Sequence, residues 1–263
     1  MRHTKELFSL DGRVAIVTGG RGMYGGSIST GLVEMGATVV IASRNGAKCD
    51  EFAETLRQQG YDAIGLSMDL SDDNSIKNFV KEVYDRYGHI DILVNNAVDR
   101  SNMVNMGDAT REQLQDSAST NLNGQIILSQ EVLKYMVAAQ KGNIINISSM
   151  RGIDCPHFPY YKNGHPVNYT TEKWAMVGLT KYMAGCYGKD HIRVNCIAPG
   201  GFWPGEAPEP GKNQFYDTYI ANCPLGCWAD DDDIKGPVAF LASDASAYVT
   251  GATLVMDGGW TIW

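Results

Sequence analysis

The chain has 263 residues, 44% of them hydrophobic and 20% charged, with a formal net charge of −8. This length and composition are ordinary for one globular domain with a full core. The acidic balance argues against nucleic acid or an anionic membrane as a partner, because both repel negative charge. No stretch approaches the roughly 18 apolar residues of a membrane span, and no signal-peptide pattern is present, so a cytoplasmic protein is expected.

The six cysteines have no spacing typical of a zinc site or of a disulfide framework. We interpret them as reduced and mostly buried small apolar residues, and we expect no metal site.

Short apolar runs and helical patterns alternate along the chain in the order of βαβ units. Strands are expected at residues 13–18, 38–42, 63–68, 91–94, 142–147, 192–197 and 253–256. Helices are expected at residues 27–36, 73–87, 113–136, 169–187 and 233–241. This alternation predicts an α/β fold with a parallel doubly wound sheet and helices on both faces. No linker or repeat divides the chain, so residues 1–263 are expected to form one domain.

A glycine-rich turn, Thr18-Gly-Gly-Arg-Gly-Met-Tyr-Gly25, follows the first strand. Such a turn lets the backbone approach a pyrophosphate, whose charge the next helix N-terminus stabilises. Taken alone, the pattern fits a mere tight turn equally well. As a dinucleotide site it would contribute Gly19, Arg21, Met23, Tyr24 and Gly25.

The end of the second strand distinguishes between the two nicotinamide dinucleotides, because an acid there binds a free ribose 2′-hydroxyl and a base binds a 2′-phosphate. The chain has Ser43 and Arg44 at this place and no acid. Arg44, with Arg21, is suited to a bidentate phosphate contact, which favours NADP(H). NAD(H) stays open, because an arginine can also stack on the adenine. Asp69 and Leu70, after the third strand, are expected beside the adenine.

Tyr169 and Lys173 are four residues apart in a helical pattern and therefore project from the same face. A nearby ammonium favours the phenolate form of a tyrosine, which provides a proton donor and acceptor without a metal. Tyr160 and Tyr161 have no lysine four residues later, so Tyr169 is the candidate.

These motifs, in this order, make the chain resemble the short-chain dehydrogenase/reductase family over nearly its whole length. The residues that carry the resemblance are Thr18-Gly19, Asp69, Asn95-Asn96-Ala97, Asn121, Ser149-x-x-Gly152, Tyr169-x-x-x-Lys173 and Pro199-Gly200. The resemblance implies a single Rossmann-type domain of about seven strands, usually assembled as a homotetramer or a homodimer.

The resemblance also implies a catalytic tetrad of Asn121, Ser149, Tyr169 and Lys173. Tyr169 would exchange a proton with the substrate oxygen while the nicotinamide exchanges a hydride with the carbon. Lys173 would support Tyr169 and bond the nicotinamide ribose, Ser149 would polarise the substrate oxygen, and Asn121 would hold a water that links Lys173 to solvent. Further cofactor contacts are implied for Asn96, Ala97, Pro199, Gly200 and Phe202, with Asn95 as a structural hydrogen-bonding residue.

Two departures from the family pattern concern the site. Met23 stands where the family usually has glycine, and the segment between Ser149 and Tyr169 is about seven residues longer than is common. We expect residues 150–168 to form a substrate loop and residues 200–224, which begin in a proline- and glycine-rich stretch, to form a lid. Candidate substrate contacts are Arg151, His157, Lys162, His165 and Trp203.

The sequence therefore predicts an NAD(P)-dependent oxidoreductase that interconverts a secondary alcohol and a carbonyl on a small polar substrate. The resemblance extends to a branch that acts on sugars, sugar acids and polyols. Two alternatives stay open: a 3-oxoacyl-type keto reductase and a cofactor-binding module without catalysis.

Overall fold

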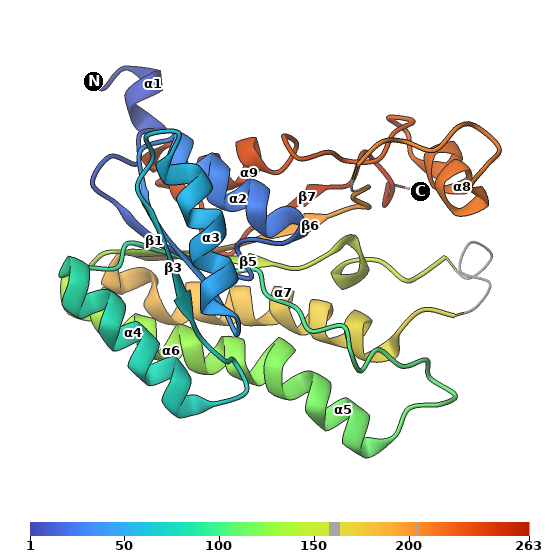
Figure 1. Cartoon of the computed structure of the whole chain (residues 1–263), viewed down its shortest axis with the longest axis horizontal. Coiled ribbons are helices and arrows are strands. Elements are labelled where there is room, and N and C mark those ends of the chain that lie inside the picture. The colour runs from blue at the N-terminus through green and yellow to red at the C-terminus, as the bar shows by residue number, and fades with distance from the viewer. Residues whose placement is uncertain (158–163, 204, 263) are drawn as a thin grey trace.

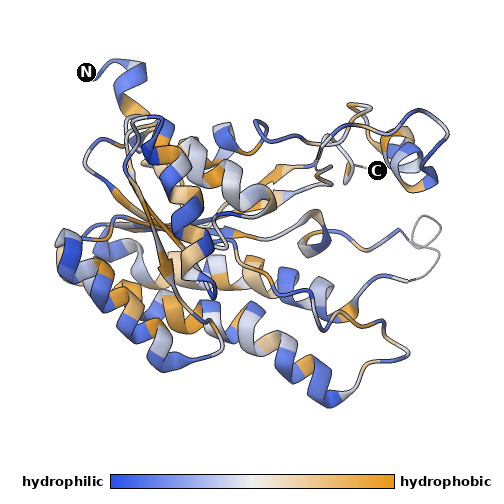
Figure 2. Cartoon of the chain, viewed as in Figure 1, coloured by the Kyte–Doolittle hydropathy of each residue, from blue (hydrophilic) through white to orange (hydrophobic). Residues whose placement is uncertain are grey.

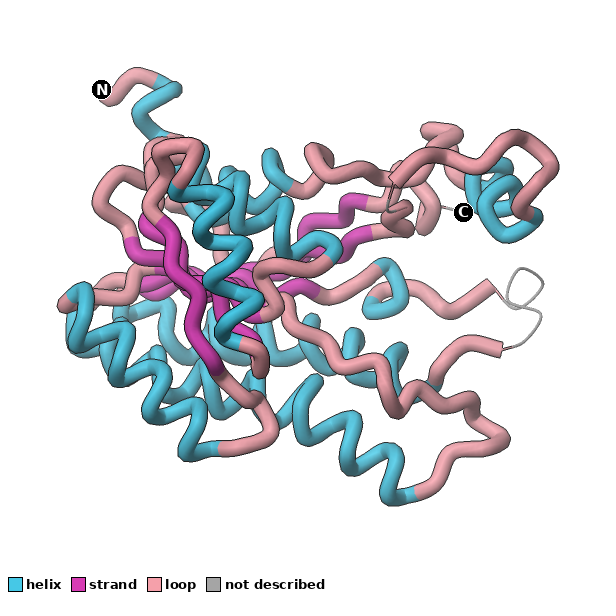
Figure 3. Tube along the Cα trace, viewed as in Figure 1, coloured by secondary structure: helices cyan, strands magenta, loops and turns pink. Residues whose placement is uncertain are grey.

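The computed structural model describes residues 1–157, 164–203 and 205–262 (Figure 1). A seven-stranded parallel sheet in the order β3-β2-β1-β4-β5-β6-β7 lies at its centre (Figure 3). The strands are β1 (Val14–Thr18), β2 (Thr38–Ser43), β3 (Ala63–Ser67), β4 (Ile92–Asn95), β5 (Gly142–Ile147), β6 (Ile192–Pro199) and β7 (Thr253–Met256). The predicted sheet is thus confirmed.

Helices cover both faces of the sheet (Figure 1). One layer contains α2 (Met23–Glu34), α3 (Gly46–Arg57) and α9 (Lys235–Ala242), and the other contains α4 (Asp73–Tyr87), α6 (Gln125–Ala139) and α7 (Val167–Tyr187). Shorter helices are α1 (Thr4–Leu7), α5 (Arg111–Ala118) and α8 (Gln214–Asn222). Most strand residues are apolar, which suits a sheet that helices cover on both faces (Figure 2). Neighbouring strand residues enter opposite cores: Ile16 packs with α4 and α6, and Val17 packs with α2 and α9.

The structure differs from the sequence prediction in several features, including helices α3 and α8, which were not predicted. The helix expected at 113–136 is α5 and α6 joined by a π-helical turn, Ser119–Gly124. Three of the six free cysteines, Cys155, Cys186 and Cys227, are exposed, so the interpretation of mostly buried cysteines was wrong for half of them.

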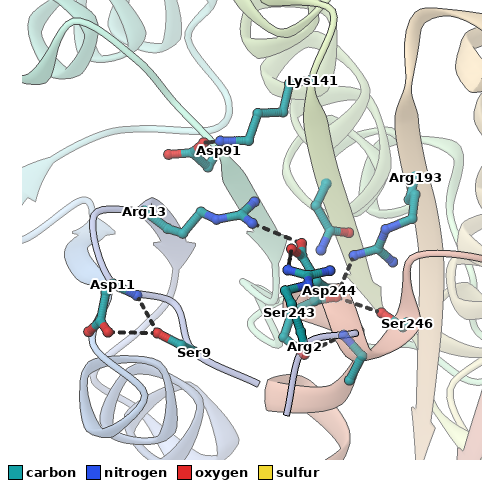
Figure 4. Close-up of polar contacts among 12 residues, drawn as sticks. Arg2, Ser9, Asp11, Arg13, Asp91, Lys141, Arg193, Ser243, Asp244 and Ser246 are labelled. Carbon is teal, nitrogen blue, oxygen red and sulfur yellow. Dashed lines mark hydrogen bonds and ion pairs between the residues drawn. The ribbon is translucent and has the colours of Figure 1, made fainter. Parts of the chain in front are cut away.

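A polar cluster lies at the amino ends of the strands (Figure 4). Asp244 pairs with Arg2 at 2.6 Å and with Arg13 at 2.8 Å, so it joins the N-terminal segment to the turn after α9. Arg193 in β6 donates to the carbonyls of Leu241 and Ser243 at 2.9 and 3.1 Å. The sequence motifs expected to carry the chemistry lie at the opposite, carboxyl ends of the strands. At that end the strand order reverses between β1 and β4.

None of the helices in the described ranges has the length and apolar character that a bilayer span requires. Within the same ranges, no group of three or more His, Cys, Asp or Glu side chains is arranged to hold a metal ion.

Candidate active site

A cavity of about 640 Å³ opens at the carboxyl ends of the strands. It is lined by most of the residues that the sequence singled out: Gly19, Met23, Tyr24, Ser43, Arg44, Asp69, Leu70, Asn96, Ala97, Ser149, Arg151, His165, Tyr169, Lys173, Pro199, Gly200 and Phe202. Residues from 18 to 228 therefore meet in one space.

Five of the sequence candidates lie outside the cavity lining: Arg21, Gly25, Asn121, His157 and Trp203. Arg21 and His157 are exposed, and Gly25 is buried under the glycine-rich turn. Trp203 packs against Tyr216 and Trp228, with ring centroids 5.0 and 5.5 Å away. Lys162 lies outside the described residues.

The glycine-rich turn is held in a tight form at the N-terminus of α2. Gly19 has φ +62°, and a Cβ on Gly25 would come 2.1 Å from the Gly19 carbonyl oxygen, so neither position accepts a larger residue without a shift. Met23 has φ +38°, a left-handed conformation that explains why glycine is the usual residue here. The Asn96 amide donates to the Thr18 carbonyl at 2.8 Å and fixes the turn to the end of β4.

Helix α7 places Tyr169 and Lys173 on its inner face. The Lys173 ammonium donates to the Ile147 carbonyl at 2.9 Å and lies 5.7 Å from the centroid of the Tyr169 ring. Lys173 is 6% exposed, whereas Tyr169 is half-buried and faces the cavity. Both residues line the same cavity, as their helical spacing predicts.

The two serines after β5 have different partners. The Ser148 hydroxyl donates to the Lys173 carbonyl at 2.7 Å, so its hydrogen is used within the fold. Ser149 Oγ accepts from the Arg151 backbone N–H at 3.1 Å, and no acceptor in the described part of the chain takes the Ser149 hydroxyl hydrogen. Ser149 is therefore the serine that can donate to a substrate oxygen.

Asn121 lies in the π-helical turn behind the cavity. Its Oδ1 accepts from the Asp99 N–H at 2.6 Å, and its Nδ2 donates to the Asp99 carbonyl at 2.9 Å and to Glu172 at 3.0 Å. Asn95 is fully buried and donates to Ser129 and Asn146, both at 2.9 Å, which agrees with its expected structural role.

Sequence reasoning missed Arg100 as a site residue. Its guanidinium carbon lies 6.0 Å from the centroid of the Tyr169 ring, and the side chain lines the cavity. No carboxylate in the described ranges forms an ion pair with Arg100. The signal was available, because Arg100 follows Asn95-Asn96-Ala97 at the carboxyl end of β4.

Three charged groups lie at the end expected to hold the adenosine: Arg44, Asp69 and Asp99. Arg44 pairs with Asp99 at 3.2 Å. Hydrogen bonds from Ser71 lower the pKa of Asp69, and hydrogen bonds from Ser101 lower the pKa of Asp99, with Arg44 lowering both further. Both acids are therefore charged at pH 7, so this end has a net charge of −1 from one cation and two anions.

Aromatic side chains form the wall opposite α7. Tyr219 in α8 is stacked between Trp228 and Trp260, with ring centroids at 3.8 and 4.6 Å, and its hydroxyl accepts from the Gly201 N–H at 2.7 Å. Phe202, Phe215, Tyr219 and Trp228 line the cavity where Trp203 was expected to do so.

His165 lines the cavity beside Tyr169, with ring centroids 5.9 Å apart. Burial and the nearby Arg151 lower the pKa of His165, so a neutral imidazole faces the cavity at pH 7. The positive charge near the Tyr169 ring therefore comes from Lys173 and Arg100 and not from His165.

The cavity has the features that a nicotinamide dinucleotide requires. The turn offers backbone at a helix N-terminus, where an added Cβ would collide. The Tyr24 hydroxyl is buried without a hydrogen-bond partner in the described structure, and burial raises the pKa of Tyr24. The residues present thus fit a nicotinamide dinucleotide, and Gly19, Tyr24, Arg44, Asn96 and Lys173 all line the cavity that would hold it.

Comparisons with known proteins agree with this geometry. The profile of the family described as Enoyl-(Acyl carrier protein) reductase matches residues 22–261. The 2-dehydro-3-deoxy-D-gluconate 5-dehydrogenase of Pseudoalteromonas atlantica is 36% identical in an alignment of 263 positions, gaps included, that covers 97% of this chain and 98% of that protein. The 3-oxoacyl-acyl-carrier-protein reductase of Pseudomonas aeruginosa is 35% identical, over 95% of this chain and 98% of that protein.

A solved structure of similar fold is a gluconate 5-dehydrogenase from Burkholderia cenocepacia in complex with NADP and tartrate. It has a TM-score of 0.88 and 33% identity, and the alignment covers 99% of this chain and 100% of that one. With the profile match and these relatives, the chain belongs to the short-chain dehydrogenase/reductase family and is an NAD(P)-dependent oxidoreductase acting on CH–OH groups.

Proposed function

We propose that the protein is an NADP(H)-dependent dehydrogenase that interconverts the secondary alcohol and the ketone of a sugar acid. The observation that carries the proposal is the position of Arg100 over the ring of Tyr169, at the reacting end of the cavity. A carboxylate bound there would form a charge-assisted hydrogen bond and would orient a neighbouring CH–OH group toward Tyr169. Relatives named for gluconate and 2-dehydro-3-deoxygluconate support this substrate class.

In the proposed reaction Tyr169 holds the proton that moves to or from the substrate oxygen. The Ser149 hydroxyl donates to the same oxygen as negative charge develops on it. Lys173 keeps a positive charge beside the Tyr169 ring and is held by the Ile147 carbonyl. The nicotinamide supplies or accepts the hydride when the cofactor is bound.

NADP(H) is favoured over NAD(H) because Arg44 lies in the cavity lining at the end of β2. The Burkholderia neighbour contains NADP, and so does a solved 2-deoxy-D-gluconate 3-dehydrogenase from Agrobacterium tumefaciens, at 30% identity and a TM-score of 0.85. The described parts of the predicted substrate loop, residues 150–157 and 164–168, would shape the substrate end of the cavity, and residues 158–163 lie outside the described residues. Residues 200–203 and 205–224 would act as a lid anchored by the Tyr219 stack, within one domain.

We further propose that the protein is a homotetramer or homodimer in the cytoplasm. Trp174 and Tyr182 on α7, which are 49% and 68% exposed, are suited to an interface between copies. The six free cysteines fit a reducing compartment.

The test is a turnover screen with purified protein and NADP, in which gluconate-type acids are compared with uncharged polyols of the same length. Wild type is expected to prefer the acid. Arg100→Met should raise KM for the acid about 10- to 100-fold, the worth of a hydrogen bond to a charged group, and should change KM for the polyol little. Arg111→Met, at an exposed arginine outside the cavity, is the matched control. Equal loss on both substrates, or a preference for a 3-oxoacyl thioester, would contradict the proposal.

A further inference from the structure

Glu172 is a buried acid in the sequence Tyr169-Thr-Thr-Glu-Lys173, directly before the lysine of the tetrad. Its side chain is 6% exposed, and no Lys, Arg or His side chain in the described ranges forms an ion pair with it. Its two oxygens accept from the Ser117 hydroxyl at 2.6 Å and from Asn121 Nδ2 at 3.0 Å. A buried carboxylate supported only by neutral donors is costly for a fold to keep.

The hydrogen-bond directions around Glu172 are fixed by its neighbours. Ser117 Oγ accepts from Asn168 Nδ2 at 2.9 Å, so the hydrogen of its own hydroxyl can point to Glu172 at 2.6 Å. Asn121 Oδ1 accepts from the Asp99 N–H, which places its Nδ2 toward Glu172. Both contacts to Glu172 therefore require an acceptor, and an ionised carboxylate provides two.

Asn121 connects this cluster to the cavity wall. It bonds the N–H and the carbonyl of Asp99, which stands between the cavity-lining residues Val98 and Arg100. It also belongs to the π-helical turn, whose residue Thr120 lines the cavity. The orientation of the Asn121 amide thus sets the position of the segment that carries Arg100.

We propose that Glu172 is a positioning residue that acts through Asn121: its carboxylate fixes the Asn121 amide and thereby the 98–100 segment beside Tyr169. This inference rests on the proposed function only where kcat is measured, because that assay needs a substrate. Glu172 is not among the residues that line the cavity, so its effect reaches the reaction through geometry and not through a proton that it transfers.

The decisive variant is Glu172→Gln, which keeps the shape and replaces one acceptor by a donor that faces Ser117 or Asn121. We expect kcat to fall about tenfold to 100-fold, the size of effect that misplaced catalytic groups produce, while NADPH binding in a fluorescence titration stays within about threefold. The double variant Asn121→Ala/Glu172→Gln should be no slower than Asn121→Ala alone, because the second change acts through the first. Additive losses, or wild-type kcat in Glu172→Gln, would overturn the proposal.

Thr180→Val is the matched control, because it removes another buried hydrogen bond of α7, from Asn146 to Thr180 at 2.8 Å, away from the cavity. It should lower the melting temperature and leave kcat near wild type. If Glu172→Gln does not fold, Ser117→Ala removes the hydroxyl donor instead, and the same non-additivity with Asn121→Ala is expected.

Hydrogen exchange separates failure of this inference from failure of the proposed function. In Glu172→Gln, amides of residues 98–102 and 117–124 should exchange faster than in wild type, and those of β1 and β2 should not, whatever the substrate is. Unchanged exchange in both segments would refute the positioning role even if no substrate were found.

Discussion

Asp99 is the residue whose charge opposes the expected cofactor preference. Its carboxylate pairs with Arg44 at 3.2 Å, and Asp69 adds a second negative charge at the same end of the cavity. A 2′-phosphate would have to compete with Asp99 for the one guanidinium there. The preference for NADP(H) is therefore weaker in this chain than Arg44 alone suggests.

Asp99→Asn is expected to tighten NADPH binding about three- to tenfold, because it releases Arg44 and removes a like charge at a partly screened site. Asparagine keeps an oxygen that can accept from the Ser101 N–H at 2.9 Å, so the turn is retained. NADH binding should change by less than about twofold. Fluorescence titration with both cofactors makes the measurement, with the exposed Asp108→Asn as control. An unchanged or weaker affinity for NADPH would show that Asp99 does not compete for Arg44.

Individual site residues were predictable where one motif fixed both identity and position. Tyr169 and Lys173 were found by helical spacing, and Ser149 was found by its Ser-x-x-Gly motif. In the structure, Tyr169 lies beside the Lys173 ammonium, and the Ser148 hydroxyl, not that of Ser149, is used by the Lys173 carbonyl. Arg100 was missed because it follows a strand without a motif of its own. Trp203 was expected to line the cavity because it lies in the lid, but Trp228, which follows the lid, lines it instead. Sequence does not tell which side of a loop faces a cavity.

At the scale of elements, the strands were the most predictable part of the fold. Their buried, β-branched runs are short and bounded by turns, and the structure places every one within about two residues of its predicted ends. Helix α3 was missed, although Cys49, Ala53 and Leu56 mark its buried face at helical spacing. Most of its other positions are polar, which makes the pattern weak.

The π-helical turn Ser119–Gly124 had no sequence signal, because one wide turn hardly disturbs the hydrophobic period of the helix around it. The turn matters for function, since it carries Asn121 and brings Thr120 to the cavity. Helix α8 was likewise hidden in the lid, where proline and glycine in residues 199–213 suggested loop throughout. The conformation of such elements depends on tertiary contacts. For helix α8 these contacts are the stacking of Tyr219 with Trp228 and Trp260.

At the scale of the whole molecule, residues that stabilise the fold and residues that line the cavity lie at opposite ends of the strands. The charged cluster around Asp244 lies at the amino ends of the strands, and the cavity lies at their carboxyl ends (Figure 4). Asp244 joins residues more than 200 positions apart through Arg2 and Arg13. Changes at this cluster should therefore affect unfolding without affecting the reaction.

The hydrogen bond from Arg2, with further help from Arg13, lowers the pKa of Asp244 in the folded state. A depressed carboxyl pKa stabilises the fold above the unfolded value of about 4 and ceases to do so as pH falls through the folded value. Asp244→Asn should therefore lower the free energy of unfolding at pH 7 by about 1 kcal/mol or less, since the pair is partly exposed and screened. The difference from wild type should shrink at acid pH, well below the unfolded value of about 4, as the Asp244 carboxyl becomes protonated in the folded state. Urea unfolding at both pH values tests this, and a difference independent of pH would refute the electrostatic cause.

The central claim is that Tyr169 exchanges the proton while the rest of the cavity binds the cofactor. The most direct measurement compares Tyr169→Phe with wild type in two assays, NADPH binding by fluorescence titration and turnover of the substrate identified in the screen. Tyr182→Phe, at an exposed tyrosine on the same helix, is the control. The account predicts that Tyr169→Phe binds NADPH within about threefold of wild type and loses about 10²- to 10⁴-fold in kcat. Turnover near that of wild type would contradict it.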